Sequence, residues 1–298
     1  MTKAKRLPTA IKYRAVRKAE MPEAVELFLT TLGDLNKRWN LNWPLPPREY
    51  VEKIYDYIRR TGIFRVAEVD GRLGAICHAV VRDQLWFLSG FWTLPHLQGQ
   101  KIGRTLLRRV WDEGARAGAE VFFTWSSIDL QAMATYMKMG MLPGYQALTF
   151  TGQPRELTWK RSGYQTQPLE LQTALVIDEQ IRETRREVDH QFWISEMKSE
   201  GRQLIRRGRA VGYYYFNSGT IGPAAWLKDE DSEALLESAA RDAAEQSEQI
   251  RLIIPGVNHA AIRFALQKNL KLTGYGHILT TAPFGKMEKY LTSGPSPF

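Results

Sequence analysis

Runs of apolar residues divide this chain into alternating strands and helices. The longest run, 85–94, is too continuous for a half-exposed strand and predicts a strand that is buried on both faces. A second apolar strand at 121–125 and a helix from about 132 to 139 follow it. Between the two strands, apolar residues recur at helical spacing, which predicts an amphipathic helix with the stripe Leu106, Leu107, Val110 and Trp111.

The same reading predicts the elements that precede this unit. They are, in order, a strand at 13–17, a helix from Met21 to Leu32, a helix at about 48–60 and strands at 63–69 and 73–80. A polar and aromatic connection, 33–47, separates the two helices. Asp70-Gly71 between the last two strands is a hairpin turn signal.

The second half of the chain repeats the first. Its predicted elements are a charged helix at 181–197, a strand at 209–216, a turn at 219–223, a helix at 232–246, a strand at 250–254 and a helix at 258–268. Asp129 falls on Asn258 at an offset of 129 (258 − 129), and the same offset places Leu106-Leu107 on Leu235-Leu236. Two landmarks that share one offset without a gap predict two copies of one fold.

A domain boundary is expected between the two copies. The stretches 151–154 and 162–168 are polar and rich in turn-forming residues. We therefore predict a first domain at 1–160 and a second at 161–298.

The loop between the strand at 85–94 and the next helix has the features of an anion site. Gly99 and Gly103 allow close approach of the backbone, and the first helical turn that follows offers bare N–H groups and a favourable dipole. The spacing fits neither the G-x-G-x-x-G fingerprint nor a P-loop. The sequence therefore predicts a phosphate-binding loop of another kind.

This loop resembles the pyrophosphate loop of the GNAT superfamily of acyl-CoA N-acyltransferases. The family pattern is Gln or Arg, two residues, Gly, one residue, then Gly or Ala, and here it reads Gln98-Gly99-Gln100-Lys101-Ile102-Gly103, with Lys101 in place of the middle Gly. Upstream, Thr93-Leu94-Pro95 stands where the family often has Val-x-Pro. Downstream, Asp129, Ala132, Tyr136 and Gly140-Met141 resemble the family's Asn-x-x-Ala, Tyr and Gly-Phe pattern.

The resemblance covers roughly residues 11–150, and more weakly the second half. It implies an α/β (α+β) fold of two tandem GNAT-like domains, each with a mixed central sheet flanked by helices. It implies an acetyl-CoA-dependent N-acetyltransferase, an acyltransferase in which Tyr136 protonates the leaving thiolate. No metal is expected, because no cluster in the sequence has metal-ligand spacing. Phe91, Trp92 and Thr93 would offer backbone N–H groups to pantetheine and the thioester. The remaining cofactor residues implied are Gln98, Gly99, Gln100, Lys101, Ile102, Gly103, Arg104, Asp129 and Lys138.

Two parts of such a site stay open. The general base could be Glu68, His78, Asp83 or His96, each of which also has a structural interpretation, and the unperturbed pKa of His78 suits a base near neutral pH. Trp39, Trp43, Trp92 and Trp125 could wall an apolar amine pocket or fill the core. The acceptor could be a small amine, an antibiotic, a peptide N-terminus or a lysine. Tyr136 itself could be a core residue with an outward hydroxyl.

The second copy has lost this chemistry. The loop residues Gln98–Gly103 fall on Leu227–Ser232, so Asp229, Glu230 and Asp231 stand where pyrophosphate would bind. Acids there stabilise a helix N-terminus and repel phosphate. Tyr136 falls on Ala265. We expect the second domain to be non-catalytic.

Composition and charge reduce the number of functional classes that fit the chain. A net charge of +9 could indicate nucleic-acid binding, but the basic residues are scattered, and the densest cluster, 206–209, comes without a helix-turn-helix or zinc-finger pattern. The charge is better explained by a polyanionic cofactor. The single cysteine, Cys77, excludes an internal disulfide and fits a reducing cytoplasm. No signal peptide and no apolar stretch of membrane-spanning length is present. A non-catalytic acyl-CoA sensor remains the alternative, against which Tyr136 argues.

Overall fold

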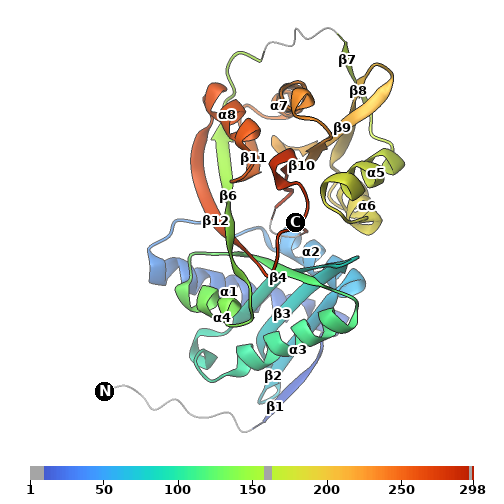
Figure 1. Ribbon diagram of the computed structural model, residues 1–298. Helices are drawn as coiled ribbons and strands as arrows, with labels where there is room; N and C mark the ends of the chain where they lie inside the picture. Colours follow the sequence, from blue (N-terminus) through green and yellow to red (C-terminus); the bar gives the residue numbers. More distant parts are fainter. Residues whose placement is uncertain (1–9, 158–162, 295–296) are drawn as a thin grey trace. The chain divides into compact units, whose positions relative to one another are not determined.

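The computed structural model describes residues 10–157, 163–294 and 297–298 (Figure 1). The chain forms two compact units, 1–122 and 123–298. The boundary predicted near residue 160 lies outside the described residues. The prediction of an α/β fold with a mixed sheet is confirmed for the described chain.

The first unit is an antiparallel sheet in the order β1-β2-β3-β4, with three helices. Its elements are β1 Ile11–Ala15, α1 Met21–Trp39, α2 Arg48–Thr61, β2 Ile63–Val69, β3 Arg72–Arg82, β4 Leu85–Thr93 and α3 Ile102–Arg116, with single 3-10 turns at Lys18–Glu20 and Pro95–Leu97. Asp70 and Gly71 both have positive φ, as the predicted β2–β3 hairpin turn requires.

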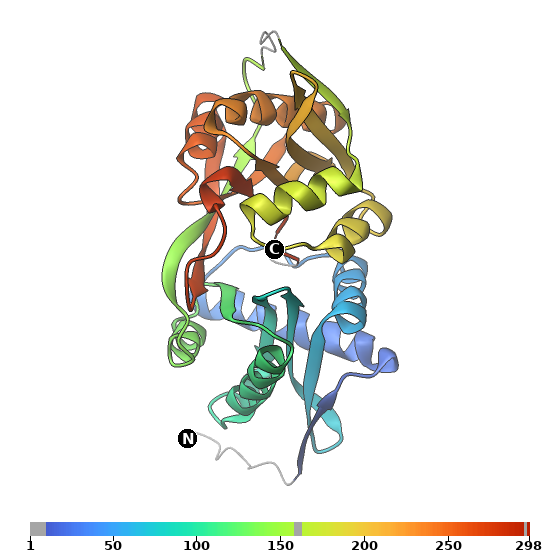
Figure 2. The ribbon, with the colours of Figure 1, turned by 45° about the vertical axis from the view of Figure 1, so that its right-hand side comes forward.

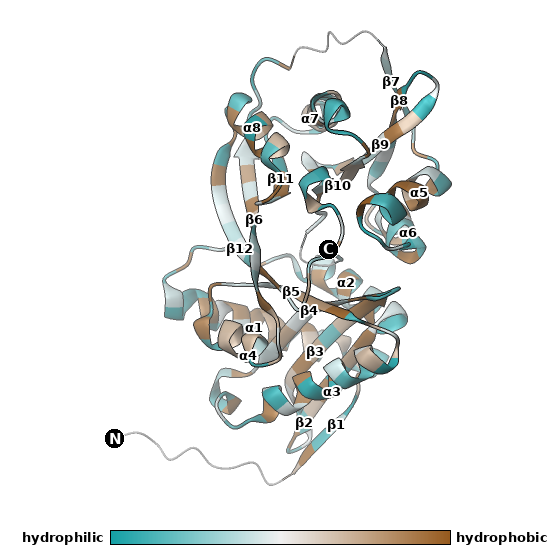
Figure 3. Cartoon of the chain, in the orientation of Figure 1, coloured by the Kyte–Doolittle hydropathy of each residue, from teal (hydrophilic) through white to brown (hydrophobic). Residues whose placement is uncertain are grey.

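Burial in the first unit follows the hydrophobic pattern. Leu85, Trp86, Phe87 and Leu88 are all buried, which confirms a β4 covered on both faces. The apolar positions on α3 face inward, and Figure 3 shows the apolar stretches on β3 and β4 and the mixed faces of α3. The helix predicted to end at Leu32 instead runs through Gly33 to Trp39, because the buried Leu35 extends the apolar stripe.

The second unit is a mixed sheet in the order β5-β12-β6-β11-β10-β9-β8-β7, and β13 also pairs with β10. Its strands are β5 Val121–Ser126, β6 Leu142–Gly152, β7 Tyr164–Pro168, β8 Glu200–Arg206, β9 Arg209–Asn217, β10 Thr220–Trp226, β11 Ile250–Pro255, β12 Lys271–Thr280 and β13 Tyr290–Leu291. Its helices are α4 Leu130–Met137, α5 Leu171–Ile181, α6 Glu187–Ser195, α7 Ser232–Gln246 and α8 His259–Gln267, with 3-10 turns at Asp229–Asp231 and Met287–Lys289. Residues 121 and 122 of β5 belong to the first unit.

The internal repeat is confirmed at the predicted offset of 129. β5 and β11, α4 and α8, and β6 and β12 each begin at equivalent residues, since 121, 130 and 142 become 250, 259 and 271. Asp129 and Asn258 are the N-caps of α4 and α8. The two copies therefore share one local design from β5 to β6.

The last strands of the two copies are exchanged. β12 lies between β5 and β6, and β6 lies between β12 and β11, as Figures 1 and 2 show for the paired red and green strands. Ala147 pairs with Gly276, its own equivalent at offset 129, so the β6–β12 ladder is centred on a local pseudo-twofold axis.

Several second-unit elements differ from the sequence prediction. The turn predicted at 219–223 is confined to Ser218-Gly219, and β10 begins at Thr220. The helix predicted at 181–197 is broken, because 182–186 turns inward and buries Arg182, Thr184 and Arg186. The stretches 151–154 and 162–168, predicted as turns, contain the end of β6 and all of β7, since pairing with β11, β12 and β8 stabilises strands that have weak local signals.

Candidate active site

The connection from β4 to α3 is held by its own polar groups. Gln98 donates from Nε2 to the Thr93 carbonyl (3.0 Å), and Gln100 donates from Nε2 to the His96 carbonyl (3.1 Å). Gly99 has φ +81° and Lys101 has φ +65°, so both lie in the left-handed region. The position where the family pattern has its middle Gly thus keeps a glycine-like backbone although it carries a lysine.

The first turn of α3 is open to an anion. No side chain caps this helix and no acid lies in its first turn, in a stretch that is described throughout. Lys101 and Arg104 are exposed beside it. By contrast, Asp129 caps α4 by accepting from the amides of Gln131 and Ala132. An uncapped N-terminus with two cations beside it favours negative charge.

Gly103 allows α3 to lie directly against the end of β4. A Cβ at this position would stand 2.5 Å from Thr93 Oγ1 and 3.0 Å from the Phe91 ring. The fold therefore brings Phe91, Thr93, Gln98 and Gly103, four of the predicted cofactor residues, into one place in the first unit. Ile102 is buried at the same turn.

The predicted aromatic residues lie in different settings. The Trp92 ring contacts the Phe28 ring edge-on at 4.9 Å. Trp39 and Trp43 are 37% and 36% exposed, so they lie at the surface of the first unit and are not core residues. Asn36 Nδ2 donates to the Trp43 carbonyl (2.8 Å) and ties the α1–α2 connection to α1.

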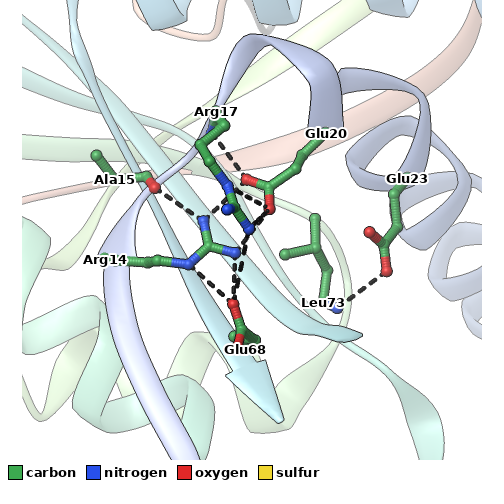
Figure 4. A network of polar contacts seen from close by, with 7 residues as sticks. All are labelled: Arg14, Ala15, Arg17, Glu20, Glu23, Glu68 and Leu73. Carbon is green, nitrogen blue, oxygen red and sulfur yellow. Dashed lines mark hydrogen bonds and ion pairs between the residues drawn. The ribbon is translucent and has the colours of Figure 1, made fainter. Parts of the chain in front are cut away.

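Glu68 belongs to a network of charges between β1, β2 and the start of α1 (Figure 4). Arg14 donates to Glu68 and to Glu20, and Arg17 also donates to Glu20. The hydrogen bond from Arg14 lowers the pKa of Glu68, and the same guanidinium lowers the pKa of Glu20 to about 2. These contacts assign Glu68 a structural role and argue against its being the general base.

His78 lies in the core of the first unit. Its ring is 4.7 Å from the rings of Tyr55 and Phe64 and lies over Gly90, where a Cβ would be 2.3 Å from Nε2. Neither ring nitrogen has a hydrogen-bond partner among the described residues. Burial lowers the pKa of His78 to about 3, so the interpretation of His78 as a base near neutral pH is not supported. Asp83 and His96 are both exposed.

We expect His78→Leu to keep turnover and to flatten the acid side of the stability profile. The pKa of His78 is about 3 in the folded chain and 6.5 as a free side chain, so the unfolded state binds more protons between these values. The free energy of unfolding then falls on acidification by up to about 1.4 kcal/mol per pH unit, and the variant loses this slope. Urea unfolding at several pH values measures it, with His96→Leu as an exposed control. Equal slopes in His78→Leu and the parent would contradict the prediction.

The downstream motif folds in the second unit. Tyr136 lies near the end of α4 with 7% of its surface exposed, Lys138 is the exposed C-cap residue, and Gly140 ends the turn with φ +97°. The Met141 amide donates to the Tyr136 carbonyl (3.2 Å). Asp129, Tyr136 and Lys138 thus belong to the second unit and the loop residues to the first.

The acids in the equivalent loop of the second copy form ion pairs with residues of the same copy. Arg206 pairs with Glu230 (2.7 Å) and Asp231 (3.1 Å), and Lys289 pairs with Asp229 (3.1 Å). Tyr164 also donates its hydroxyl to Asp231 (3.0 Å). These carboxylates stand at the start of α7, and both glycines of the first copy are missing.

A buried polar cluster in the second unit was not predicted. Asp178 on α5 is fully buried and accepts from Arg186, from His190 Nε2 (2.9 Å) and from the Tyr213 hydroxyl. Burial alone would raise the pKa of Asp178, but Arg186 and His190 hold it well below its usual range. The sequence signal was the position of Asp178 on the apolar stripe of α5, between Ala174, Ile177 and Ile181.

Two classes of site find no support in the described residues. These residues contain no group of three or more His, Cys, Asp or Glu side chains that could hold a metal ion. Among the same residues, no helix combines the length and the apolar character needed to cross a membrane.

Comparisons with known proteins agree with the fold. Residues 29–141 match the acetyltransferase (GNAT) family. A proposed acetyltransferase from Pyrococcus horikoshii is similar in structure (TM-score 0.75, 16% identity, 97% of this chain and 96% of that one), as is a GCN5-related N-acetyltransferase from Sphaerobacter thermophilus (0.66, 13%, 95% and 100%). A tandem GNAT protein from the clavulanic acid pathway is also similar (0.58, 12%, 92% and 99%). No curated protein matched the chain.

Proposed function

We propose that this chain is an acetyl-CoA-dependent N-acetyltransferase that acetylates a primary amine. The match of residues 29–141 to the acetyltransferase (GNAT) family supports this proposal. Catalysis is assigned to the first copy, residues 1–160, and the second copy, 161–298, has no catalytic role. The observation that carries the proposal is the uncapped start of α3, which Gly103 packs against the end of β4.

Each part of the loop has a physical role in holding the donor. The N–H groups of the first turn of α3 and the side chain of Lys101 meet the pyrophosphate. The backbone at Phe91, Trp92 and Thr93 meets the pantetheine amides and the thioester oxygen, where N–H donors stabilise the negative charge that develops as the amine attacks. Gln98, which is hydrogen-bonded to Thr93, fixes the loop relative to that strand end.

Tyr136 is assigned as the acid of the reaction. The amine nitrogen bonds to the thioester carbon, the carbon–sulfur bond breaks, and the thiolate takes the hydroxyl proton of Tyr136. Glu68 is held in ion pairs and His78 is buried with a lowered pKa, so neither is assigned as the base. The proton from the amine is assigned to water, and the Tyr136 phenolate takes a proton back from water. Asp129, as the cap of α4, positions the helix that carries Tyr136.

We expect Lys101→Gly to raise stability and to weaken acetyl-CoA binding. Glycine relieves a left-handed backbone that costs a lysine about 1 kcal/mol, while loss of the cation costs about 1 kcal/mol of binding, roughly a 5-fold rise in Kd. Arg207→Gly is the matched control, because Arg207 also has a positive φ and is exposed in the β8–β9 turn. Thermal melts and calorimetric titration separate the two effects. Unchanged acetyl-CoA affinity in Lys101→Gly would remove Lys101 from the site.

The direct test of the function is a thiol-release assay with acetyl-CoA. The amine panel should include small amines, amine-bearing antibiotics, peptide N-termini and lysine side chains. Turnover on any member supports the transferase. Acetyl-CoA binding without turnover on the whole panel would instead favour a non-catalytic acyl-CoA sensor.

A further inference from the structure

β10 and β11 of the second unit pair only where they begin. The parallel register joins Thr220 to Arg251 and Ile221 to Leu252, and no further pair between the two strands is found in this described stretch. The pairing of β10 with β9 shifts between Ile221 and Ala224, so β10 continues along a changed path. These two strands come before and after α7, as β4 and β5 come before and after α3, so by element order they correspond to β4 and β5 of the first copy.

A later segment of the chain, residues 287–294, lies between the two strands. Its strand β13 pairs antiparallel with the end of β10, Leu291 with Ala224 and Tyr290 with Ala225. Thr292 pairs with Ile253 of β11 and donates its amide to the Ile253 carbonyl (3.2 Å). We call the place between Ala224-Ala225 and Ile253 the slot.

The segment is packed inside the slot and is part of the core of the second unit. Tyr290, Leu291 and Thr292 are completely buried. The Asn258 Nδ2 atom donates to the Tyr290 carbonyl (3.0 Å), while Oδ1 of the same side chain caps α8. Gly222 leaves room for the segment, since a Cβ there would lie 2.3 Å from the Thr292 carbonyl oxygen.

The same segment reaches two further features of the second copy. Lys289 pairs with Asp229, one of the acids at the start of α7, and Nζ donates to the Leu227 carbonyl (3.3 Å). The Tyr290 hydroxyl accepts from Arg186 (2.8 Å) in the buried cluster with Asp178. The segment thus spans from the α7 start to the interior between β10 and β11.

We infer that residues 287–294 are a built-in ligand that takes the place of the acyl donor's pantetheine arm in the second copy. This inference rests on the proposed binding of acetyl-CoA by the first copy. There the end of β4 offers its backbone to an extended, amide-bearing arm, and the end of β10 offers its backbone to an extended peptide. The second copy therefore has two obstacles to acyl-CoA, the acids before α7 and a filled slot.

The first experiment is hydrogen exchange on two matched cap variants of the full chain. Asn258→Asp keeps the cap oxygen but replaces the donor to Tyr290 with an oxygen that repels its carbonyl, so we expect the Thr292 amide to exchange at least about 10-fold faster. Asp129→Asn makes the opposite change at the equivalent cap, and protection of Thr292 should stay as in the parent. Equal protection of Thr292 in all three proteins would overturn the role of Asn258 in holding a ligand.

The second experiment releases the segment after the chain has folded. A protease site inserted between Thr281 and Ala282, just after β12, allows cleavage of the native protein. We expect the cleaved segment to remain bound during gel filtration and, once washed out under mild denaturant, to rebind as a synthetic peptide of residues 287–298 with recovery of the melting temperature. Loss of the segment without any fall in melting temperature would overturn the inference.

The pantetheine comparison has its own measurement on the cleaved protein. S-acetyl-pantetheine, which has no phosphates for the acids before α7 to repel, should displace a labelled 287–298 peptide at millimolar concentration. In the uncleaved parent chain, where the segment is still attached, S-acetyl-pantetheine should not displace the segment from the slot. Peptide binding that is indifferent to S-acetyl-pantetheine would show that the slot is not shaped for a donor arm. A negative thiol-release assay would not change the expected peptide measurements. Failure of the proposed function and failure of this inference are therefore distinguishable.

Discussion

Tyr136→Phe should lower kcat by roughly 10- to 10⁴-fold while the affinity for acetyl-CoA changes little. The substitution removes only the hydroxyl, so the thiolate must leave without its acid. Tyr136 is 93% buried on α4, and the Phe ring keeps the packing of that helix. Steady-state kinetics with a good acceptor, together with calorimetric binding of acetyl-CoA, measure the two quantities separately.

Tyr55→Phe is the matched control for this variant. The Tyr55 hydroxyl is buried and has no hydrogen-bond partner among the described residues, so its removal should leave kcat as it is. A Tyr136→Phe protein that turns over like Tyr55→Phe would assign the acid role to another group, and Tyr136 would then be a packing residue.

Asp178→Asn should lower the free energy of unfolding by about 3–5 kcal/mol, because it leaves the Arg186 guanidinium buried without its carboxylate. Asp178 and Arg186 are 0% and 1% exposed, so water cannot replace the lost partner. The pKa of Asp178 is lowered in the folded chain, so this contribution is present above the usual carboxyl range and is lost as the pH falls toward the folded value. Chemical denaturation at neutral pH measures the effect.

Two further variants show whether the unpaired charge of Arg186 causes the loss of stability. Asp56→Asn breaks ion pairs with Arg59 and Arg60 on the surface of α2 and should cost less than about 1 kcal/mol. The double variant Asp178→Leu/Arg186→Met should recover much of the loss, since an apolar pair leaves no unpaired charge. A single Asp178→Asn variant as stable as Asp56→Asn would contradict the account of the cluster.

The sequence predicted best where local signals and the repeat agree. β2, β11, α7 and the caps Asp129 and Asn258 lie where the apolar pattern and the offset of 129 place them. The loop at 98–103 was also predicted, because glycines mark positions where the local backbone needs a residue without a side chain. The left-handed backbone of Lys101 was not predicted, because a lysine seldom adopts that conformation.

The parts that sequence reading missed depend on distant partners. β6 and β12 contain Gly144, Gly152, Gly274 and Gly276, which look like turns until the two strands pair with each other. Nothing local to Asp178 or His190 shows that they meet Tyr213 and Tyr215. His78 is the candidate base that the sequence left open and the fold does not support, because its burial lowers its pKa to about 3.

The exchange of β6 and β12 has a consequence for how the protein is made. Ser126 in β5 pairs with His277, which the ribosome adds 151 residues later (277 − 126). Until then β5 and β6 each have an open edge, which can pair with the same strands of another nascent chain. Helix α4, which carries Tyr136, follows β5 directly, so its support is complete only when nearly the whole chain has been synthesised. Cotranslational folding of the first copy should therefore stall at β5. When many ribosomes translate one mRNA at the same time, strand-exchanged dimers should be the main by-product.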